Sequence, residues 1–446
     1  MANNHRLSFW QLFNLNFGFF GVQIAYALQS ANISRIFATL GADPHQLSFF
    51  WILPPLMGMI VQPLIGKWSD KTWCRMGRRK PYLLVGAIVA VAVMMLLPNA
   101  GSFNLGKAYL FLGLNAAMWF GLFSLIFLDT SINVAMQPFK MMVGDMVCEE
   151  QKAKAYSIQS FLCNAGSLVG YLFPIFFTWI GLANTAPEGV IPDSVIWSFY
   201  CGAAILILCV LFTFFKVKEM PPKEYAEFHG LDASGAAKED NPGFIRLLKR
   251  APKTFWTVSL VQFFCWAAFL FLWTYTNGAI AETCWGTTDA ASSGYQAAGN
   301  WVGVLFAVEA IGAMLWAFAI PRFKTLRRAY TVSLMIGAAG FLSVFFLHNQ
   351  YLLIVSFLLI GVVWGAMLAI PFTFVTNALS DHIGTYLGLF NCAICLPQII
   401  AAAFGGLILN LVGGTQVNMF IVAAVLLVCG AFATIFVKEH EQSINN

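Results

Sequence analysis

Residues 66–81 read GKWSDKTWCRMGRRKP and bring six basic side chains together in one short stretch. Apolar blocks flank it, near 46–67 and 81–100, and each is long enough to cross the hydrocarbon core of a bilayer. Basic residues gather in the loops that stay on the cytoplasmic side of a membrane. The stretch therefore predicts a cytoplasmic turn between two transmembrane helices, and we refer to it as the basic turn.

The composition of the whole chain also indicates a membrane protein. Of its 446 residues, 59% are hydrophobic and only 10% are charged, whereas soluble domains average about 25% charged residues. Twelve apolar blocks are long enough to span a bilayer, and they lie near 9–37, 46–67, 81–100, 106–147, 155–182, 194–216, 254–280, 299–320, 329–347, 351–378, 384–412 and 417–437. We therefore predict an all-α integral membrane protein with twelve transmembrane helices, which excludes the soluble classes.

The other basic residues set the predicted orientation. They concentrate in 216–253 and 322–328, on the side of the basic turn, while the opposite side holds few, such as Arg35 and Lys107. The positive-inside rule then places both termini in the cytoplasm. The net charge of +5 reflects the basic residues of the cytoplasmic loops and does not indicate a nucleic-acid-binding patch. The lipid bilayer is therefore an expected partner, and nucleic acid is not. Short tails and short outer loops favour a bacterial inner membrane.

One long hydrophilic segment, 217–253, divides the chain. It has mixed charge and several prolines. It separates a predicted N-terminal six-helix half, 1–216, from a C-terminal six-helix half, 254–446. A second basic stretch, AIPRFKTLRRAY at 319–330, lies between the second and third helices of the C-terminal half, as the basic turn does in the N-terminal half. This echo favours an internal repeat.

The chain shows no pattern typical of an enzyme. Its ten cysteines are scattered, and Cys392 and Cys395 lie mid-helix among apolar residues, where a packing role is expected. Its six histidines lie in tails, loops or helix ends, and none forms a ligand pair. We therefore expect no metal, no cofactor and no catalysis.

A polar stretch interrupts the fourth apolar block. Residues 129–140 read DTSINVAMQPFK, and a charged side chain inside a bilayer costs at least about 2.5 kcal/mol. At about 100° per residue, Asp129, Asn133, Met136 and Lys140 share one helix face. We expect this face to line a cavity. A structural charge network is the alternative, although Asp129 and Lys140 lie about 16 Å apart along a helix.

The basic turn resembles the loop between helices 2 and 3 of the major facilitator superfamily. Gly66, Asp70, Gly77 and Arg78 fall at the offsets of that signature. Gly77 permits a tight turn, and Asp70 can meet a helix N-terminus or a basic residue. The resemblance implies two six-helix halves that work by alternating access. Asp70, Gly77 and Arg78, together with Asp145 near the same end of the fourth helix, are then the expected gating residues. A plain positive-inside turn is the alternative.

Three other stretches are similar to the plant sucrose:proton symporters and their animal and bacterial relatives, within the glycoside–pentoside–hexuronide:cation symporter group. They are GVQIAYALQ at 21–29, the run from Asp129 to Asp145, and GLFNCAICLPQ at 388–398. The resemblance implies a secondary active transporter that imports a glycoside with a cation. An α-glucose-containing disaccharide such as maltose or sucrose is the expected substrate, and a proton is the expected cation. A monomer is expected.

The chain departs from the plant pattern in three places. Lys140 stands where the family has arginine, and the stretches LLPNAGSF at 96–103 and FLWTYTNG at 271–278 lack the acids that plant members carry there. Lysine donates as a point charge without the planar fork of arginine. An uncoupled or sodium-coupled porter for another glycoside therefore stays open.

Sugar sites combine amide or acid side chains with aromatic platforms. The candidate substrate-binding residues are Gln23, Tyr26, Asp129, Asn133, Lys140, Gln262, Trp266, Trp273, Asn391 and Gln398. Each has a structural alternative, because transmembrane aromatics often face lipid and amides often bridge helices. Asp129 and Glu309 are the candidate coupling residues, since these two acids lie deep in apolar blocks.

Overall fold

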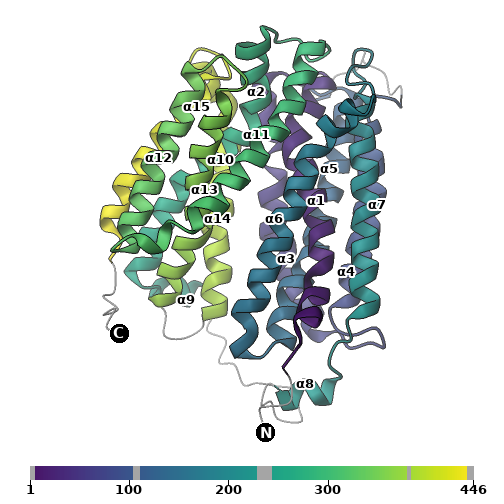
Figure 1. Cartoon of the computed structure of the whole chain (residues 1–446), viewed down its shortest axis with the longest axis vertical. Helices are drawn as coiled ribbons and strands as arrows, with labels where there is room; N and C mark the ends of the chain where they lie inside the picture. The colour runs from purple at the N-terminus through teal and green to yellow at the C-terminus, as the bar shows by residue number, and fades with distance from the viewer. Residues whose placement is uncertain (1–5, 104–110, 229–243, 379–382, 439–446) are drawn as a thin grey trace. The chain divides into compact units, whose positions relative to one another are not determined.

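The computed structural model describes residues 6–103, 111–228, 244–378 and 383–438 (Figure 1). These residues form helices joined by turns, with no strand among them. The helices are α1 (Phe9–Thr39), α2 (Pro44–Phe50), α3 (Leu53–Lys71), α4 (Lys80–Leu96), η1 (Leu97–Asn99), α5 (Ala116–Met146), α6 (Glu149–Trp179), α7 (Asp193–Lys216), α8 (Pro222–Phe228), α9 (Phe244–Arg250), α10 (Lys253–Trp285), α11 (Ser293–Ala317), η2 (Ile320–Arg322), α12 (Leu326–Phe346), α13 (Leu353–Asn377), α14 (Ile383–Leu411), α15 (Asn418–Ala433) and η3 (Thr434–Phe436). The predicted all-α class is confirmed.

The long helices match the predicted apolar blocks. Among the described residues, eleven helical spans are long and apolar enough to cross a membrane. The first predicted span corresponds to α1, which is 31 residues long but falls outside those eleven because amides such as Asn16, Gln23 and Gln29 make it more polar. The chain is therefore a multi-pass membrane protein.

The helix boundary that differs most from the prediction is the start of α5. The fourth apolar block was expected to begin near 106, but α5 begins at Ala116. The Asn115 side chain accepts a hydrogen bond from the Met118 backbone N–H at 2.8 Å, which is the geometry of a helix N-cap. Residues 104–110 lie outside the described part of the chain. Hydropathy alone therefore placed the start too early, because it does not detect the cap.

The chain forms two compact units. Unit 1 comprises Met1–Ser30, Met57–Phe177 and Asp193–Gly243, and unit 2 comprises Ala31–Leu56, Thr178–Pro192 and Phe244–Asn446. Unit 2 therefore contains two pieces from the N-terminal half of the sequence. The predicted linker 217–253 includes 229–243, which lie outside the described residues, and its two ends hold the short helices α8 and α9.

Glycines allow close helix contacts within each unit. In unit 1, α4 lies beside α5 and α7 (Figure 1), and a Cβ added at Gly86 would come within 2.6 Å of the Ala135 backbone nitrogen on α5. In unit 2, α13 packs along α11 and α12, and a Cβ at Gly361 would come within 2.2 Å of the Glu309 carbonyl oxygen. Small residues let helix backbones approach closely in membranes. These contacts fix the backbones of α5 and α11, which carry the two candidate coupling acids.

Candidate functional site

Asp129 lies in the middle of α5 in unit 1, and only 2% of the residue is exposed. The side-chain amide of Gln29, on α1, donates a hydrogen bond to Asp129 Oδ1. Two acceptors beside this bond, Asp129 Oδ2 and Gln29 Oε1, are buried and have no donor among the described residues. Buried polar atoms without a partner are rare in native proteins. The pair is therefore arranged to accept a further donor.

Asn133, one turn further along α5, extends this site. Its Nδ2 donates to the Asp129 carbonyl oxygen at 2.8 Å, and Gln62 Nε2 on α3 donates to Asn133 Oδ1 at 2.7 Å. Helices α1, α3 and α5 thus supply one connected set of polar side chains, namely Gln29, Asp129, Asn133 and Gln62. We call this set the polar chain. It brings two predicted residues together with two that were not predicted.

The remainder of the predicted α5 face is not part of the polar chain. Met136 is buried, whereas Lys140 is exposed and follows Pro138, a proline inside the helix. A proline at this position removes one backbone hydrogen bond from the helix ladder. The structure therefore brings Asp129 and Asn133 into one cluster and leaves Lys140 outside it.

Two further candidates lie on the unit 1 part of α1. Gln23 is buried, and its amide has no hydrogen-bond partner among the described residues. Tyr26 is the more exposed of the two, with 37% of the residue accessible. A Cβ added at Gly166 on α6 would come within 3.0 Å of Gln23 Cβ, so α6 packs closely here. The free amide of Gln23 is available to a ligand.

An aromatic cluster centres on Trp273 of α10 in unit 2. Its ring centroid lies 6.0 Å from that of Trp51, 6.3 Å from Trp266 and 5.9 Å from Trp364. Trp273 and Trp364 are half-buried, so parts of their rings stay accessible. Trp266 Nε1 is buried and has no acceptor among the described residues. We call Trp51, Trp266, Trp273 and Trp364 the tryptophan cluster. It unites two predicted residues, and it holds an indole donor that no described acceptor satisfies.

The three predicted amides of the C-terminal half are bonded within unit 2. Gln262 is fully buried; its Nε2 donates to the Met367 carbonyl oxygen at 3.1 Å, and its Oε1 accepts from the Tyr330 hydroxyl at 3.3 Å. It therefore bridges α10 to α12 and α13. Asn391 and Gln398 each donate to an atom of their own helix, α14. These contacts correspond to the helix-bridging alternative for Gln262 and to local bonds for the other two.

Glu309 lies in α11 of unit 2, where 5% of the residue is exposed. Its carboxylate has no hydrogen bond or ion pair with any described residue. Taking a charged carboxylate out of water costs several kcal/mol unless a partner offsets that cost. A bound proton or cation would remove the penalty, so Glu309 keeps the properties expected of a coupling acid.

The basic turn forms a charge network in unit 1. Asp70 accepts hydrogen bonds from Nη2 of Arg78 at 2.5 Å and from Nη2 of Arg79 at 2.6 Å, and Arg79 Nε donates to Asp145 Oδ2 at 2.7 Å. Burial alone would lower the pKa of Arg79, but the hydrogen bonds and charges of Asp145 and Asp70 hold that pKa above its ordinary value. Three of the predicted gating residues therefore meet through Arg79, which was not predicted.

The start of the linker packs onto the basic turn. The Glu219 carboxylate accepts hydrogen bonds from three successive backbone N–H groups, those of Arg78 at 2.7 Å, Arg79 at 2.9 Å and Lys80 at 2.7 Å. These groups form the N-terminus of α4, where a negative charge is favourable. Gly77 has φ +114°, and a Cβ there would come within 2.7 Å of Glu219 Cδ. Gly77 is thus required by its backbone conformation and by this contact.

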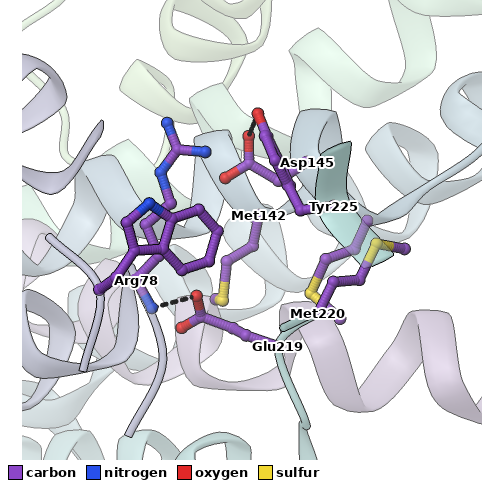
Figure 2. A pocket seen from close by; sticks show the side chains of 8 residues that line it. Arg78, Met142, Asp145, Glu219, Met220 and Tyr225 are labelled. Atoms are coloured by element: carbon purple, nitrogen blue, oxygen red, sulfur yellow. Dashed lines mark hydrogen bonds between the residues drawn. The ribbon is translucent and has the colours of Figure 1, made fainter. Parts of the chain in front are cut away.

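Helix α8 adds a second contact from the linker. The Arg78 guanidinium lies 4.7 Å from the ring centroid of Tyr225 and 5.3 Å from that of Trp73. Figure 2 shows Tyr225 directed at Asp145, to which its hydroxyl donates at 3.5 Å, with Glu219 beside Arg78. We call Glu219 and Tyr225 the linker clamp. The clamp holds both arginines of the network from the side of the linker.

Sequence reasoning missed several of these residues, and the signals available for them differ. Gln29 stands in the motif at 21–29 and could have been chosen with Gln23. Trp51 and Trp364 are isolated aromatic residues in apolar blocks, and the sequence there does not distinguish a site residue from a lipid-facing one. Glu219 lies in a segment of mixed charge, which is typical of a solvated loop.

Membrane-length helices, a charge network at the basic turn, and buried acids that pair with no cation among the described residues define a multi-pass membrane transporter. The chain belongs to the Major Facilitator Superfamily, whose family model matches residues 15–280 and 273–446. The superfamily predicted from the basic turn is therefore confirmed.

Three known proteins place the chain more closely. The sucrose transport protein SUT5 of Oryza sativa subsp. indica is 24% identical over 472 residues, which cover 94% of this chain and 86% of that protein. The general alpha-glucoside permease of Schizosaccharomyces pombe is 25% identical over 278 residues, 58% of this chain and 46% of the permease. The crystal structure of a D-xylose-proton symporter superposes with a TM-score of 0.65 at 15% identity, covering 95% of each chain, and so shares the fold.

Proposed function

We propose that the chain is a secondary transporter that imports an α-glucose-containing disaccharide, of the maltose or sucrose type, in symport with protons. The observation that carries this proposal is the pair of buried acceptors at Asp129 Oδ2 and Gln29 Oε1, which have no donor among the described residues. Sugar hydroxyls and protonated carboxyls are donors of the kind such acceptors bind. The names of two relatives, a sucrose transport protein and an alpha-glucoside permease, support the substrate class.

Aromatic side chains support a sugar in particular. A pyranose ring has apolar C–H faces as well as hydroxyls, so it packs on aromatic rings while its edges form hydrogen bonds. Trp273 and Trp364 keep part of their rings accessible, and Trp266 Nε1 offers a donor to a sugar oxygen. Gln23 and Tyr26 add an unpartnered amide and an exposed ring on α1. We assign sugar contacts separately to the polar chain with Gln23 and Tyr26 in unit 1, and to the tryptophan cluster in unit 2.

The remaining predicted binding residues take other roles in this proposal. Gln262 bridges three helices, and Asn391 and Gln398 bond within α14. We therefore place these three outside the sugar site. Lys140 is exposed on α5. We retain it as a donor either to the sugar or to a carboxylate whose charge changes during the transport cycle.

Coupling requires a group that gains and loses a proton with the sugar. Asp129 and Glu309 are buried acids that pair with no cation among the described residues. Asp129 is positioned to bind a proton and a sugar hydroxyl at one site. Glu309 supplies a second acid in a chain that lacks acids in 96–103 and 271–278.

Transport by alternating access requires gates at the two membrane faces. We infer that the halves 1–216 and 254–446 alternate, and that the network of Asp70, Gly77, Arg78 and Asp145 gates the cytoplasmic side. The concentration of basic residues near this network supports a cytoplasmic location for it and for both termini. A monomer in a bacterial inner membrane is the form we propose.

A sodium-coupled or uncoupled porter for another glycoside is the second candidate. It is favoured by the sequence at 271–278, where Trp273 and Tyr275 occupy a stretch that carries acids in the plant symporters. Fewer acids leave fewer groups that can carry a proton. A sodium-coupled or uncoupled porter would therefore not concentrate its sugar in response to a pH gradient.

Counterflow into proteoliposomes tests the substrate assignment. Vesicles loaded with an unlabelled sugar are diluted into the labelled one, with maltose, sucrose, lactose, xylose and uridine compared, and protein-free vesicles serve as the control. We expect counterflow of maltose or sucrose and none of uridine. Counterflow of xylose or uridine with none of either α-glucoside would contradict the assignment.

A further inference from the structure

Arg35 is a fully buried guanidinium on α1 with 1% of the residue exposed, and it belongs to unit 2. Its Nε donates to Gln296 Oε1 at 2.7 Å, its Nη1 to Asn300 Oδ1 at 2.9 Å, and its Nη2 to Asn184 Oδ1 at 2.8 Å. No carboxylate pairs with it among the described residues. A buried arginine bound only by neutral amides is unusual, because charges taken out of water are ordinarily paired.

The amides that receive Arg35 are themselves held in place. Gln296 Nε2 donates to Thr39 Oγ1 at 3.0 Å, and Asn300 Nδ2 donates to Thr178 Oγ1 at 2.8 Å. These bonds direct both amide oxygens at the guanidinium. We call Arg35, Asn184, Gln296 and Asn300 the arginine latch.

Gly299 makes room for the latch on α11. A Cβ added there would come within 2.5 Å of both Arg35 Cδ and Nε. The guanidinium therefore lies directly against the α11 backbone, and any larger residue at 299 would displace it. This gives a way to disturb the latch without removing its charge.

The latch joins parts of the chain that are distant in sequence. Arg35 and Asn184 come from the N-terminal half of the sequence, whereas Gln296 and Asn300 come from the C-terminal half. Arg35 lies near the end of α1, and the chain crosses the membrane again through α3 before it reaches the basic turn. From this chain topology we infer that the latch lies at the membrane face opposite the basic turn.

The chemistry of the latch favours reversible closure. Hydrogen bonds from a charged donor are stronger than those between neutral groups, but they are offset by the cost of dehydrating the guanidinium. Neutral partners leave no opposite charge to separate when the contact opens, and water then solvates the arginine. A closed state held this way is only moderately favoured over an open one, as a two-state transporter requires.

We propose that Arg35 is the positioning residue of the outer gate: it closes the membrane face opposite the basic turn by binding Gln296 and Asn300, and it releases them when that face opens. The inference rests on the alternating access proposed above. It adds a second gate, built on neutral amides, to the charge network at the basic turn.

Hydrogen–deuterium exchange of the purified full-length protein tests this gate without any sugar, so its outcome is independent of the substrate assignment. The variants are Arg35→Ala, Arg35→Lys and Gly299→Ala. We expect Arg35→Ala and Gly299→Ala to raise exchange about tenfold in peptides that cover 31–42 and 293–300, as a loss of about 1.4 kcal/mol of closure would do. Exchange in 66–81 should fall, because opening one face closes the other. Arg35→Lys should show an exchange rate between those of the wild type and Arg35→Ala, because an ammonium lacks the planar fork with which a guanidinium reaches three acceptors.

The matched control is Asn349→Ala, at an amide expected near the same membrane face. The Asn349 side chain accepts a hydrogen bond from the Tyr351 backbone N–H and takes no part in the latch. This variant should exchange as the wild type does in all three segments. A rise in exchange at both faces in the latch variants would show simple loss of stability and overturn the gate. No change in 31–42 and 293–300 would overturn it as well. Gly299→Ala retains Arg35, so it decides the question should Arg35→Ala fail to fold.

Discussion

Asp129 and Gln29 together present more hydrogen-bond acceptors than the neighbouring described donors satisfy. One hydrogen bond joins them, and Asp129 Oδ2 and Gln29 Oε1 stay unsatisfied. Leaving a buried polar atom unsatisfied costs about 1–3 kcal/mol. A proton on Asp129, a sugar hydroxyl, or both would recover that energy. The proposed function therefore predicts that proton and sugar binding stabilises this pair.

Replacing Asp129 with asparagine tests this role. The amide keeps the shape of the side chain but cannot take up a proton. We expect Asp129→Asn to abolish accumulation of the sugar above its external concentration and to weaken sugar binding about tenfold, the effect of losing roughly 1.4 kcal/mol. Uptake and equilibrium binding in proteoliposomes measure the two effects.

The control for this substitution is Asp193→Asn, which changes an exposed acid at the start of α7. It should transport as the wild type does, which separates the buried position from the mere loss of one carboxylate. Undiminished accumulation by Asp129→Asn would remove Asp129 from the coupling site.

Single residues were predictable where helix periodicity governs them. The spacing of Asp129 and Asn133 placed both on one face, and the structure joins them in the polar chain. Lys140 shares that spacing but is exposed, and periodicity alone does not say how far along a helix a buried face extends. Gln262 had the spacing of a site residue, yet its bonds to two neighbouring helices depend on tertiary packing that no single helix encodes.

At the scale of elements, the linker clamp couples the central loop to the basic turn. The Glu219 carboxylate accepts hydrogen bonds from three backbone N–H groups at the start of α4, and the Tyr225 ring packs against the Arg78 guanidinium. These contacts are made to Arg78, Arg79 and Lys80 of the basic turn. We therefore expect the clamp to act on the movement of the gate and not on sugar contacts.

Glu219→Gln should slow turnover while leaving the KM for the sugar within about twofold, or ~0.4 kcal/mol, of the wild type. The amide removes the negative charge from the α4 N-terminus, which is worth about 0.3–1 kcal/mol at such a position. Initial rates of counterflow over a range of sugar concentrations separate kcat from KM. The matched control is Glu227→Gln, at an exposed acid of α8 that forms no hydrogen bond or ion pair with a described residue. A raised KM with unchanged kcat would place Glu219 in the sugar site instead.

Element boundaries followed from hydropathy, because each membrane helix must be apolar over nearly its whole length. Most predicted blocks therefore lie close to helices of the structure. The block at 46–67 is divided between α2 and α3, and the start of α5 is determined by the Asn115 cap. The docking of Glu219 and Tyr225 could not be predicted, since a polar loop gains its partners only when distant segments meet. The same reason kept Asn184 and Gln296 from being linked to Arg35.

At the scale of the whole molecule, the proposed function requires a sugar site, a coupling acid and a gate at each membrane face. We propose the polar chain and the tryptophan cluster for sugar contacts, Asp129 and Glu309 for coupling, and the basic turn and the arginine latch for the two gates. The sequence predicts an internal repeat of six helices from two basic stretches in corresponding positions, and this repeat stays a prediction. The composition of units 1 and 2 could not be predicted, because it depends on which helix ends pack together in one conformation.

Sugar accumulation driven by an imposed pH gradient tests the central claim most directly. Proteoliposomes with an alkaline interior, in sodium-free buffer, are given the α-glucoside identified by counterflow. We predict that the wild type concentrates the sugar and that a protonophore abolishes this. Glu309→Gln should exchange the sugar yet fail to concentrate it, because the amide carries no proton. Sugar that only equilibrates in the wild type, or that accumulates with a sodium gradient in place of the pH gradient, would contradict the account.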